Sequence, residues 1–257
     1  MTTPMPSAFT GSTLISELSS ICVFDLETTG VDVFGDRIVT AYLGRINLRG
    51  EVTGSYSWLV NPGVPISEGA AAIHGISDEV AERDGQDAKT AIGEMLTILR
   101  RSIDSGRPTV AYNASFDLSM LNAEAVRYGY EPIDYTDVVV IDPYVIDKAI
   151  DRYRKGKRQL VVTARHYGVQ LDEAAAHDAE ADAVATGRVA WAVLAKCEDV
   201  SLAELYGRQI GWAADQAASF QEYKRRTEPE FVADGRWPLR SAPLVIAEPA
   251  DDGDFDN

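Results

Sequence analysis

The stretch Ile21-Cys22-Val23-Phe24-Asp25-Leu26-Glu27-Thr28-Thr29-Gly30 joins a short apolar run to two closely spaced carboxylates. The run from Ile21 to Phe24 is typical of a buried β-strand. Because side chains two apart on a strand share a face, Asp25 and Glu27 point the same way. Two carboxylates held together away from water repel each other, and a hard cation such as Mg²⁺ or Mn²⁺ would relieve the repulsion. The pair predicts a metal site, although a lone pair of this kind is also typical of a solvated strand end or a helix cap.

The composition is that of an ordinary globular protein, with 257 residues of which 46% are hydrophobic and 25% charged. This length suffices for one domain with extensions. The two cysteines, Cys22 and Cys197, stand in apolar surroundings and outside any metal-binding or redox spacing. The N-terminus lacks the features of a secretory signal, and no stretch is apolar for long enough to span a bilayer. These features predict a reduced, cytoplasmic protein that does not contact a membrane.

The net charge of −16 limits the kinds of nucleic-acid binding that can be expected. An acidic protein gains little from the counterion release that drives coating of duplex DNA. An enzyme that grips one end of a strand through metals and a local pocket stays compatible with this charge. Part of the excess lies after Arg240, where the chain has several carboxylates and no Lys or Arg, as expected for a disordered tail.

The apolar pattern predicts an α/β fold. Two β-rich runs, 37–46 and 51–60, follow the first strand and are separated by Arg49-Gly50, so the first three strands should form an antiparallel meander. Further strands are expected at 109–112 and 138–141, and helices at 87–103, 115–128, 159–167, 179–196 and 202–225. This order describes a mixed five-stranded sheet flanked by helices.

Two later segments carry further candidate ligands. Asp117 follows Asn113 and Phe116 and falls in the first turn of a predicted helix, where the helix dipole favours a carboxylate in any case. His177 precedes an Ala-rich helix that carries Asp182, and a lone His there is also typical of a cap or a surface position. The spacing of the apolar residues turns Asp178 and Glu180 away from Asp182, so we expect both to be solvated.

Together these segments resemble the DEDD superfamily of 3′–5′ exonucleases, in its His-containing DEDDh subclass. The closest type is the proofreading, DnaQ-like one, represented by the epsilon subunit of bacterial DNA polymerase III. The matching pieces run in the family's order from Val23 to about Leu194, and Ala72-Ile73-His74-Gly75-Ile76 stands where the family has a nucleotide-contacting loop. Tyr112 departs from the family, which often has His there. The resemblance implies a ribonuclease H-like fold.

The resemblance also implies roles for individual residues. Asp25 would bridge two divalent ions, Mg²⁺ or Mn²⁺, with Glu27, Asp117 and Asp182 as the other metal ligands, and His177 would be the general base. The implied catalytic set is therefore His177, Asp25, Glu27, Asp117 and Asp182. The implied substrate contacts are Leu26, Thr28, Thr29, Ile73, His74, Ile76, Asn113 and Phe116.

The function implied is removal of nucleoside 5′-monophosphates from the 3′ end of single-stranded DNA, in proofreading or repair. An exoribonuclease acting on short RNA and a non-catalytic module bound to a polymerase or clamp are the alternatives. We expect a disordered leader at 1–13, the exonuclease domain at 14–198, a C-terminal helix and docking extension at 199–240, and an acidic disordered tail at 241–257. Gln216 to Phe220 faintly resembles a clamp-binding motif but is expected to pack in the core.

Overall fold

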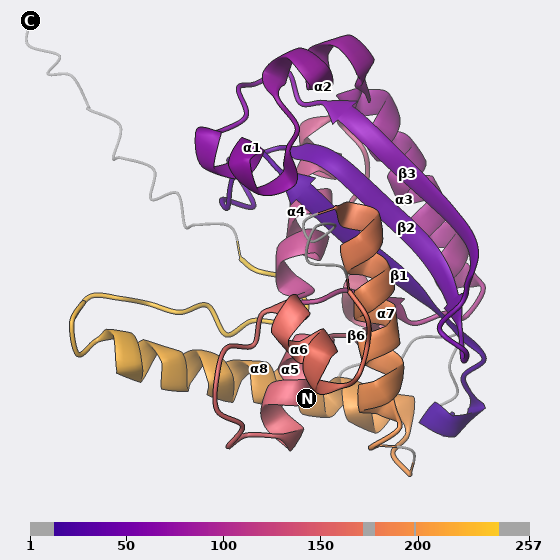
Figure 1. Ribbon diagram of the computed structural model, residues 1–257, viewed down its shortest axis with the longest axis vertical. Helices are drawn as coiled ribbons and strands as arrows, with labels where there is room; N and C mark the ends of the chain where they lie inside the picture. The colour runs from indigo at the N-terminus through magenta and orange to yellow at the C-terminus, as the bar shows by residue number, and fades with distance from the viewer. Residues whose placement is uncertain (1–12, 172–177, 198, 242–257) are drawn as a thin grey trace, which may run out of the picture.

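The computed structural model describes residues 13–171, 178–197 and 199–241 (Figure 1). The described part is a mixed sheet with helices on both faces. The strands are β1 (Ser20–Thr28), β2 (Ile38–Asn47), β3 (Val52–Asn61), β4 (Gln86–Asp87), β5 (Thr109–Val110) and β6 (Val140–Ile141). Their order across the sheet is β4-β3-β2-β1-β5-β6.

The predicted antiparallel meander is confirmed, because β1 pairs antiparallel with β2 and β2 antiparallel with β3. β5 and β6 then add in parallel beside β1. The sheet has six strands rather than the predicted five, since β4 pairs in parallel with the end of β3. With only two residues, β4 is too short to leave an alternating pattern in the sequence.

The longer helices lie close to the predicted ranges. The α-helices are α1 (Glu68–His74), α2 (Asp78–Asp84), α3 (Ala88–Asp104), α4 (Ser115–Arg127), α5 (Pro143–Ile150), α6 (Leu160–His166), α7 (Ala179–Leu194) and α8 (Leu202–Lys224), and the short 3-10 turns are Ile15–Glu17 and Tyr135–Asp137. Three short helices, α1, α2 and α5, fall where the apolar spacing predicts none. His74, expected in a loop, is the last residue of α1, which Gly75 ends with a φ of 76°.

Alternate residues of β1 point into two different cores, one on each face of the sheet. Cys22, Phe24 and Leu26 join the core formed with α3 and α4. Ile21 and Val23 join the core formed with α7, which crosses the other face (Figure 1). By the same alternation Asp25 and Glu27 lie on the α7 side.

Helix α8 covers the edge of the sheet at β6. The buried Gln209 donates from Nε2 to the Val140 carbonyl oxygen at 3.0 Å and accepts from the Asp142 N–H at 2.7 Å. These bonds satisfy backbone groups that an uncovered edge strand would leave free. The chain then returns along α8, and Trp237 packs against Tyr206 with a ring-centroid distance of 5.4 Å.

The segment from Gln216 to Phe220, near the end of α8, is less buried than predicted. We expected Gln216 to Phe220 to pack in the core, but Phe220 is 50% exposed and contacts Phe231 edge-on at 5.4 Å. Gln216 uses its Nε2 to donate to the Val145 carbonyl oxygen. Among the described residues, no helix combines the length and apolar character needed to cross a membrane.

Candidate active site

Three carboxylates from two elements meet on the α7 face of the sheet. Asp25 and Glu27 come from the end of β1, and Asp182 comes from the first turn of α7. Each offers a ligand oxygen, and these oxygens lie within 4.8 Å of one another. Half-burial keeps the three side chains reachable from solvent while removing part of their hydration. This is a spacing that a single cation can span.

Asp117 reaches the same place from the other side of β1. β5 pairs only with Cys22 and Val23, so the edge of β1 is open from there onward. Asp117, in the first turn of α4, accepts the Leu26 N–H at 3.2 Å and thereby closes this edge. Its side chain is buried. The end of β1 is therefore bordered by carboxylates on its face and along its edge.

The carboxylates of this cluster are partly desolvated and repel one another. Burial raises the pKa of Asp25 well above its usual range, and the charges of Asp117, Asp182 and Glu27 raise it further. Burial raises the pKa of Glu27 to about 8, with added repulsion from Asp182 and Asp117. Burial also raises the pKa of Asp117 to about 8. Hard oxygen donors that repel each other in this way fit a divalent cation.

A tight turn between β5 and α4 positions Asn113 and Asp117, and sequence reasoning missed the residue that holds it. Asn113 has a φ of 65°, a left-handed conformation that asparagine tolerates. The buried Asp142 accepts the N–H groups of Asn113 at 3.0 Å and Ala114 at 2.9 Å. It also accepts from Trp237 Nε1 at 3.3 Å. The available signal was Asp142 before Pro143, a typical helix start.

Arg240 is a second residue that the sequence did not identify. Its Nε donates to Ser115 Oγ at 3.4 Å, and its backbone N–H donates to Ser119 Oγ at 2.8 Å. The guanidinium lies 5.3 Å from the centre of the Phe116 ring. Its positive charge also lowers the pKa of Asp117, against the larger effect of burial. The C-terminal extension thus brings a cation to the acidic site.

The two threonines after Glu27 are buried and hydrogen-bonded within the chain. A shift in pairing register between Glu27 and Thr28 marks a bulge at this end of β1. Thr28 Oγ1 donates to the Gly30 carbonyl oxygen at 2.6 Å, and Thr29 Oγ1 donates to Asp36 at 2.8 Å. Their hydroxyls therefore shape the bend that follows the carboxylates.

The other predicted substrate contacts occupy several positions around the site. His74 and Ile76 line a cavity of about 250 Å³ together with Asp178 at the start of α7. Ile73 is 56% exposed, whereas the Leu26 side chain is buried in the core against α3 and α4. Asn113 is exposed, and Phe116 lies half-buried beneath Arg240.

The predicted general base, His177, lies outside the described residues. Its neighbour Asp178 is the N-cap of α7 and accepts the N–H groups of Glu180 and Ala181. Asp178 and Glu180 are both exposed, as the spacing of the helix predicts. The predicted leader and acidic tail also fall outside the description, apart from Thr13 and Ser241.

Clustered carboxylates at the end of a strand are an arrangement that enzymes use to hold divalent metal ions beside a phosphodiester. The sequence matches the RNase T family model, described as exonuclease, over residues 22–190. The chain belongs to this exonuclease family.

Two curated relatives illustrate the family at sequence level. A DNA polymerase III PolC-type protein of Listeria monocytogenes is 27% identical over 199 residues, which are 76% of this chain and 13% of that protein. A DNA polymerase III subunit epsilon-like protein of Rhodobacter capsulatus is 32% identical over 166 residues, which are 64% of this chain and 22% of that protein. The chain therefore matches only a minor part of the length of each.

Two solved structures share the fold. E. coli exonuclease I in complex with a dT13 oligonucleotide gives a TM-score of 0.59 at 21% identity, over 71% of this chain and 42% of that one. The nuclease domain of 3′hExo, a DEDDh family member bound to rAMP, gives 0.59 at 15% identity, over 72% of this chain and 96% of that one.

Proposed function

We propose that this protein is a 3′–5′ exonuclease that releases nucleoside 5′-monophosphates from single-stranded DNA. The observation that carries the proposal is the convergence of Asp25, Glu27 and Asp182, with ligand oxygens within 4.8 Å of one another. Asp117 adds a fourth carboxylate through its bond to the Leu26 N–H. The charges that act on Asp25 come from other carboxylates and raise its pKa, an arrangement that a bound cation would stabilise.

The four carboxylates would hold two divalent ions, Mg²⁺ or Mn²⁺, with Asp25 shared between them. When bound, such ions activate water near neutral pH and neutralise charge at a phosphate. They would also offset the net charge of −16 at the point where an anionic substrate must approach.

The remaining residues would position the strand and move a proton. His177 would take the proton from the attacking water, since an ordinary His pKa near 6.5 suits a base at neutral pH. Ile73, His74 and Ile76 would pack against the terminal bases. Asn113 and Phe116 would contact the following nucleotide, with Arg240 above the Phe116 ring as a cation for a nearby phosphate.

DNA is the favoured substrate because the curated relatives are named as DNA polymerase III proteins and E. coli exonuclease I carries a dT13 oligonucleotide. RNA is the second candidate, since 3′hExo is bound to rAMP. We also propose a polymerase as partner. The relatives are named as DNA polymerase III proteins, and the region that matches this chain is only a small part of the PolC-type protein.

A degradation assay with 5′-labelled single strands tests this function. We expect stepwise shortening of single-stranded DNA from the 3′ end in Mg²⁺ or Mn²⁺, slower action on duplex DNA and RNA of the same sequence, and none in EDTA. Faster degradation of RNA than of single-stranded DNA would contradict the assignment of DNA as the substrate and favour RNA instead. Failure of all three substrates would contradict the proposed activity.

A further inference from the structure

A basic cavity of about 700 Å³ lies between α5, the segment 151–159 that follows it, and α8. Lys148, Arg152, Arg154 and Arg158 line it together with aromatic side chains of α8. We propose that this cavity, named the α5–α8 groove, binds the phosphates and bases of the single-stranded DNA upstream of its 3′ end. This inference rests on the proposed function, because it assigns the path of the strand that the acidic site would shorten.

The charge of the α5–α8 groove contrasts with that of the whole chain. Segment 151–159 carries five of the 24 Lys and Arg residues, at positions 152, 154, 155, 157 and 158, in a chain with a net charge of −16. Lys148 adds a further positive charge from α5, and Asp215 of α8 is the one carboxylate among the residues that line the groove. Such a local excess of positive charge attracts a polyanion, although the rest of the surface repels it.

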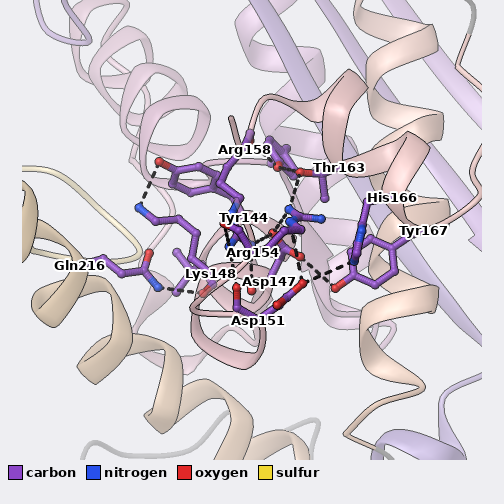
Figure 2. A network of polar contacts seen from close by, with 12 residues as sticks. Tyr144, Asp147, Lys148, Asp151, Arg154, Arg158, Thr163, His166, Tyr167 and Gln216 are labelled. Atoms are coloured by element: carbon purple, nitrogen blue, oxygen red, sulfur yellow. Dashed lines mark hydrogen bonds and ion pairs between the residues drawn. The ribbon is translucent and has the colours of Figure 1, made fainter. Parts of the chain in front are cut away.

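A buried carboxylate holds two of the arginines in place (Figure 2). Asp147 Oδ2 lies 2.5 Å from Arg154 Nη2 and 2.6 Å from Arg158 Nη1, and its Oδ1 accepts from the Tyr167 hydroxyl at 2.9 Å. Asp151 Oδ2 lies a further 3.9 Å from Arg154 Nε, so two carboxylates face these two guanidiniums, and the positive excess of the groove comes from Lys148 and Arg152. Within the described part of the chain, the buried Arg154 Nη1 has no hydrogen-bond partner. Fixed arginines of this kind bind phosphate without a further ordering cost.

The α5–α8 groove continues toward the acidic site. A second cavity, of about 590 Å³, is lined by Asp182, Asn113, Tyr144 and Arg158. It shares Arg158 with the groove and Asp182 with the carboxylate cluster. The Tyr112 hydroxyl donates to the Arg158 carbonyl oxygen at 2.6 Å and so ties segment 151–159 to the Asn113 turn. Arg158 thus borders both cavities, one of which also reaches Asp182, and the proposed strand would run from Asp182 past Arg158 into the groove.

Exposed aromatic rings border the α5–α8 groove. Phe220 and Tyr223 line it and are 50% and 63% exposed, and Tyr153 in the basic segment is 89% exposed. Aromatic faces beside a basic groove suit unpaired bases, which stack irrespective of sequence. This combination favours a single strand over a duplex, whose bases are hidden, and over an acidic protein segment, which has no bases to stack.

Binding of labelled dT3, dT6 and dT15 to the 257-residue protein in EDTA tests the proposal. The double variant Lys148→Ala/Arg152→Ala leaves the Asp147 network intact. The matched control is Lys89→Ala/Arg101→Ala, which removes two exposed charges from α3. Fluorescence anisotropy gives the affinities and their salt dependence. Binding of rU15 is measured in the same way, as the RNA counterpart of dT15.

We expect the groove variant to bind dT15 about tenfold more weakly than wild type, with a smaller loss for dT6 and the least for dT3. Its plot of log affinity against log salt should be less steep by about 0.7 for each lost phosphate contact. The control should match wild type. Equal binding of dT15 by both double variants would overturn the proposal, as would tighter binding of an Asp-rich peptide than of dT15. If the protein had no nuclease activity but showed this dependence on oligonucleotide length, the result would support DNA binding in the groove and contradict the proposed exonuclease function.

Discussion

At the residue scale, the acidic site depends on residues outside the set of carboxylates that would bind metal. Asp142 fixes the turn that carries Asn113 and precedes Asp117, through two backbone hydrogen bonds. Burial raises the pKa of Asp142 to about 6, and the hydrogen bonds from Asn113, Ala114 and Trp237 oppose that rise. The ionised form is the one that accepts all of these bonds, which is why they oppose the effect of burial on the pKa.

Arg240 offers a test of how a distant segment tunes the site. Burial raises the pKa of Asp117 to about 8, and Arg240 lowers it. Removing the positive charge in Arg240→Gln should raise the pKa of Asp117. The same charge repels a divalent cation about twice as strongly as it repels a proton, so its loss should strengthen Mn²⁺ binding, most clearly at a pH at which protons no longer compete for the carboxylates.

We expect Arg240→Gln to bind Mn²⁺ roughly three- to tenfold more tightly at pH 9 in calorimetric titrations, with a smaller gain at pH 7, where protons compete with the metal. Arg236→Gln is the control, because Arg236 pairs with Asp234 and is largely exposed. Unchanged Mn²⁺ affinity at both pH values, or an equal gain in the control, would show that the charge of Arg240 does not act on the acidic site.

At the element scale, the site exists because α7 packs closely on β1 and β2. Gly187, one turn and a half after Asp182, makes this possible. A Cβ atom added at Gly187 would lie 2.5 Å from Ile46 Cδ1 and 2.6 Å from Val23 Cγ1. The helix that carries Asp182 is thus held at a distance from Asp25 and Glu27 that only glycine allows.

Gly187→Ala should therefore lower both stability and activity. Forcing a methyl group into this contact should cost about 1–3 kcal/mol in the free energy of unfolding, measured by urea denaturation. Activity should fall in the variant even where it is fully folded, because Asp182 moves with α7. Gly207→Ala, at an exposed position of α8 with nothing within 4 Å of the added Cβ, should be neutral or stabilising. A neutral Gly187→Ala would refute the tight-packing explanation.

At the scale of the whole molecule, the sequence predicts those features that depend on residues close together in the chain. The apolar run of β1, the meander and the long helices follow from periodicity, and Asp25 and Glu27 share a face because they lie two apart on a strand. The two-residue strand β4 and the short helices α1, α2 and α5 carry too few residues for a period to show.

Contacts between distant segments account for what could not be predicted. Arg240 and Ser115 are separated by 125 positions, and Trp237 and Asp142 by 95. Neither pair leaves a pattern in the sequence, since each forms only when α8 folds across β6 and the chain returns. The basic residues of segment 151–159 can be seen in the sequence, but the cavity that some of them line forms only when α8 packs beside them.

The central claim is that the carboxylates of Asp25, Glu27, Asp117 and Asp182 form a metal site that degrades DNA. Asp25→Asn tests it most directly, because it keeps the shape of the side chain and removes one ligand charge, and Asp104→Asn at the exposed end of α3 is the matched control. In Mg²⁺ with 5′-labelled single-stranded DNA, we expect Asp25→Asn to lose activity by a factor of at least about 10³. It should unfold at or above the wild-type temperature without metal, since one repelling charge is gone, while Asp104→Asn degrades DNA normally. Normal turnover by a folded Asp25→Asn protein would contradict the account.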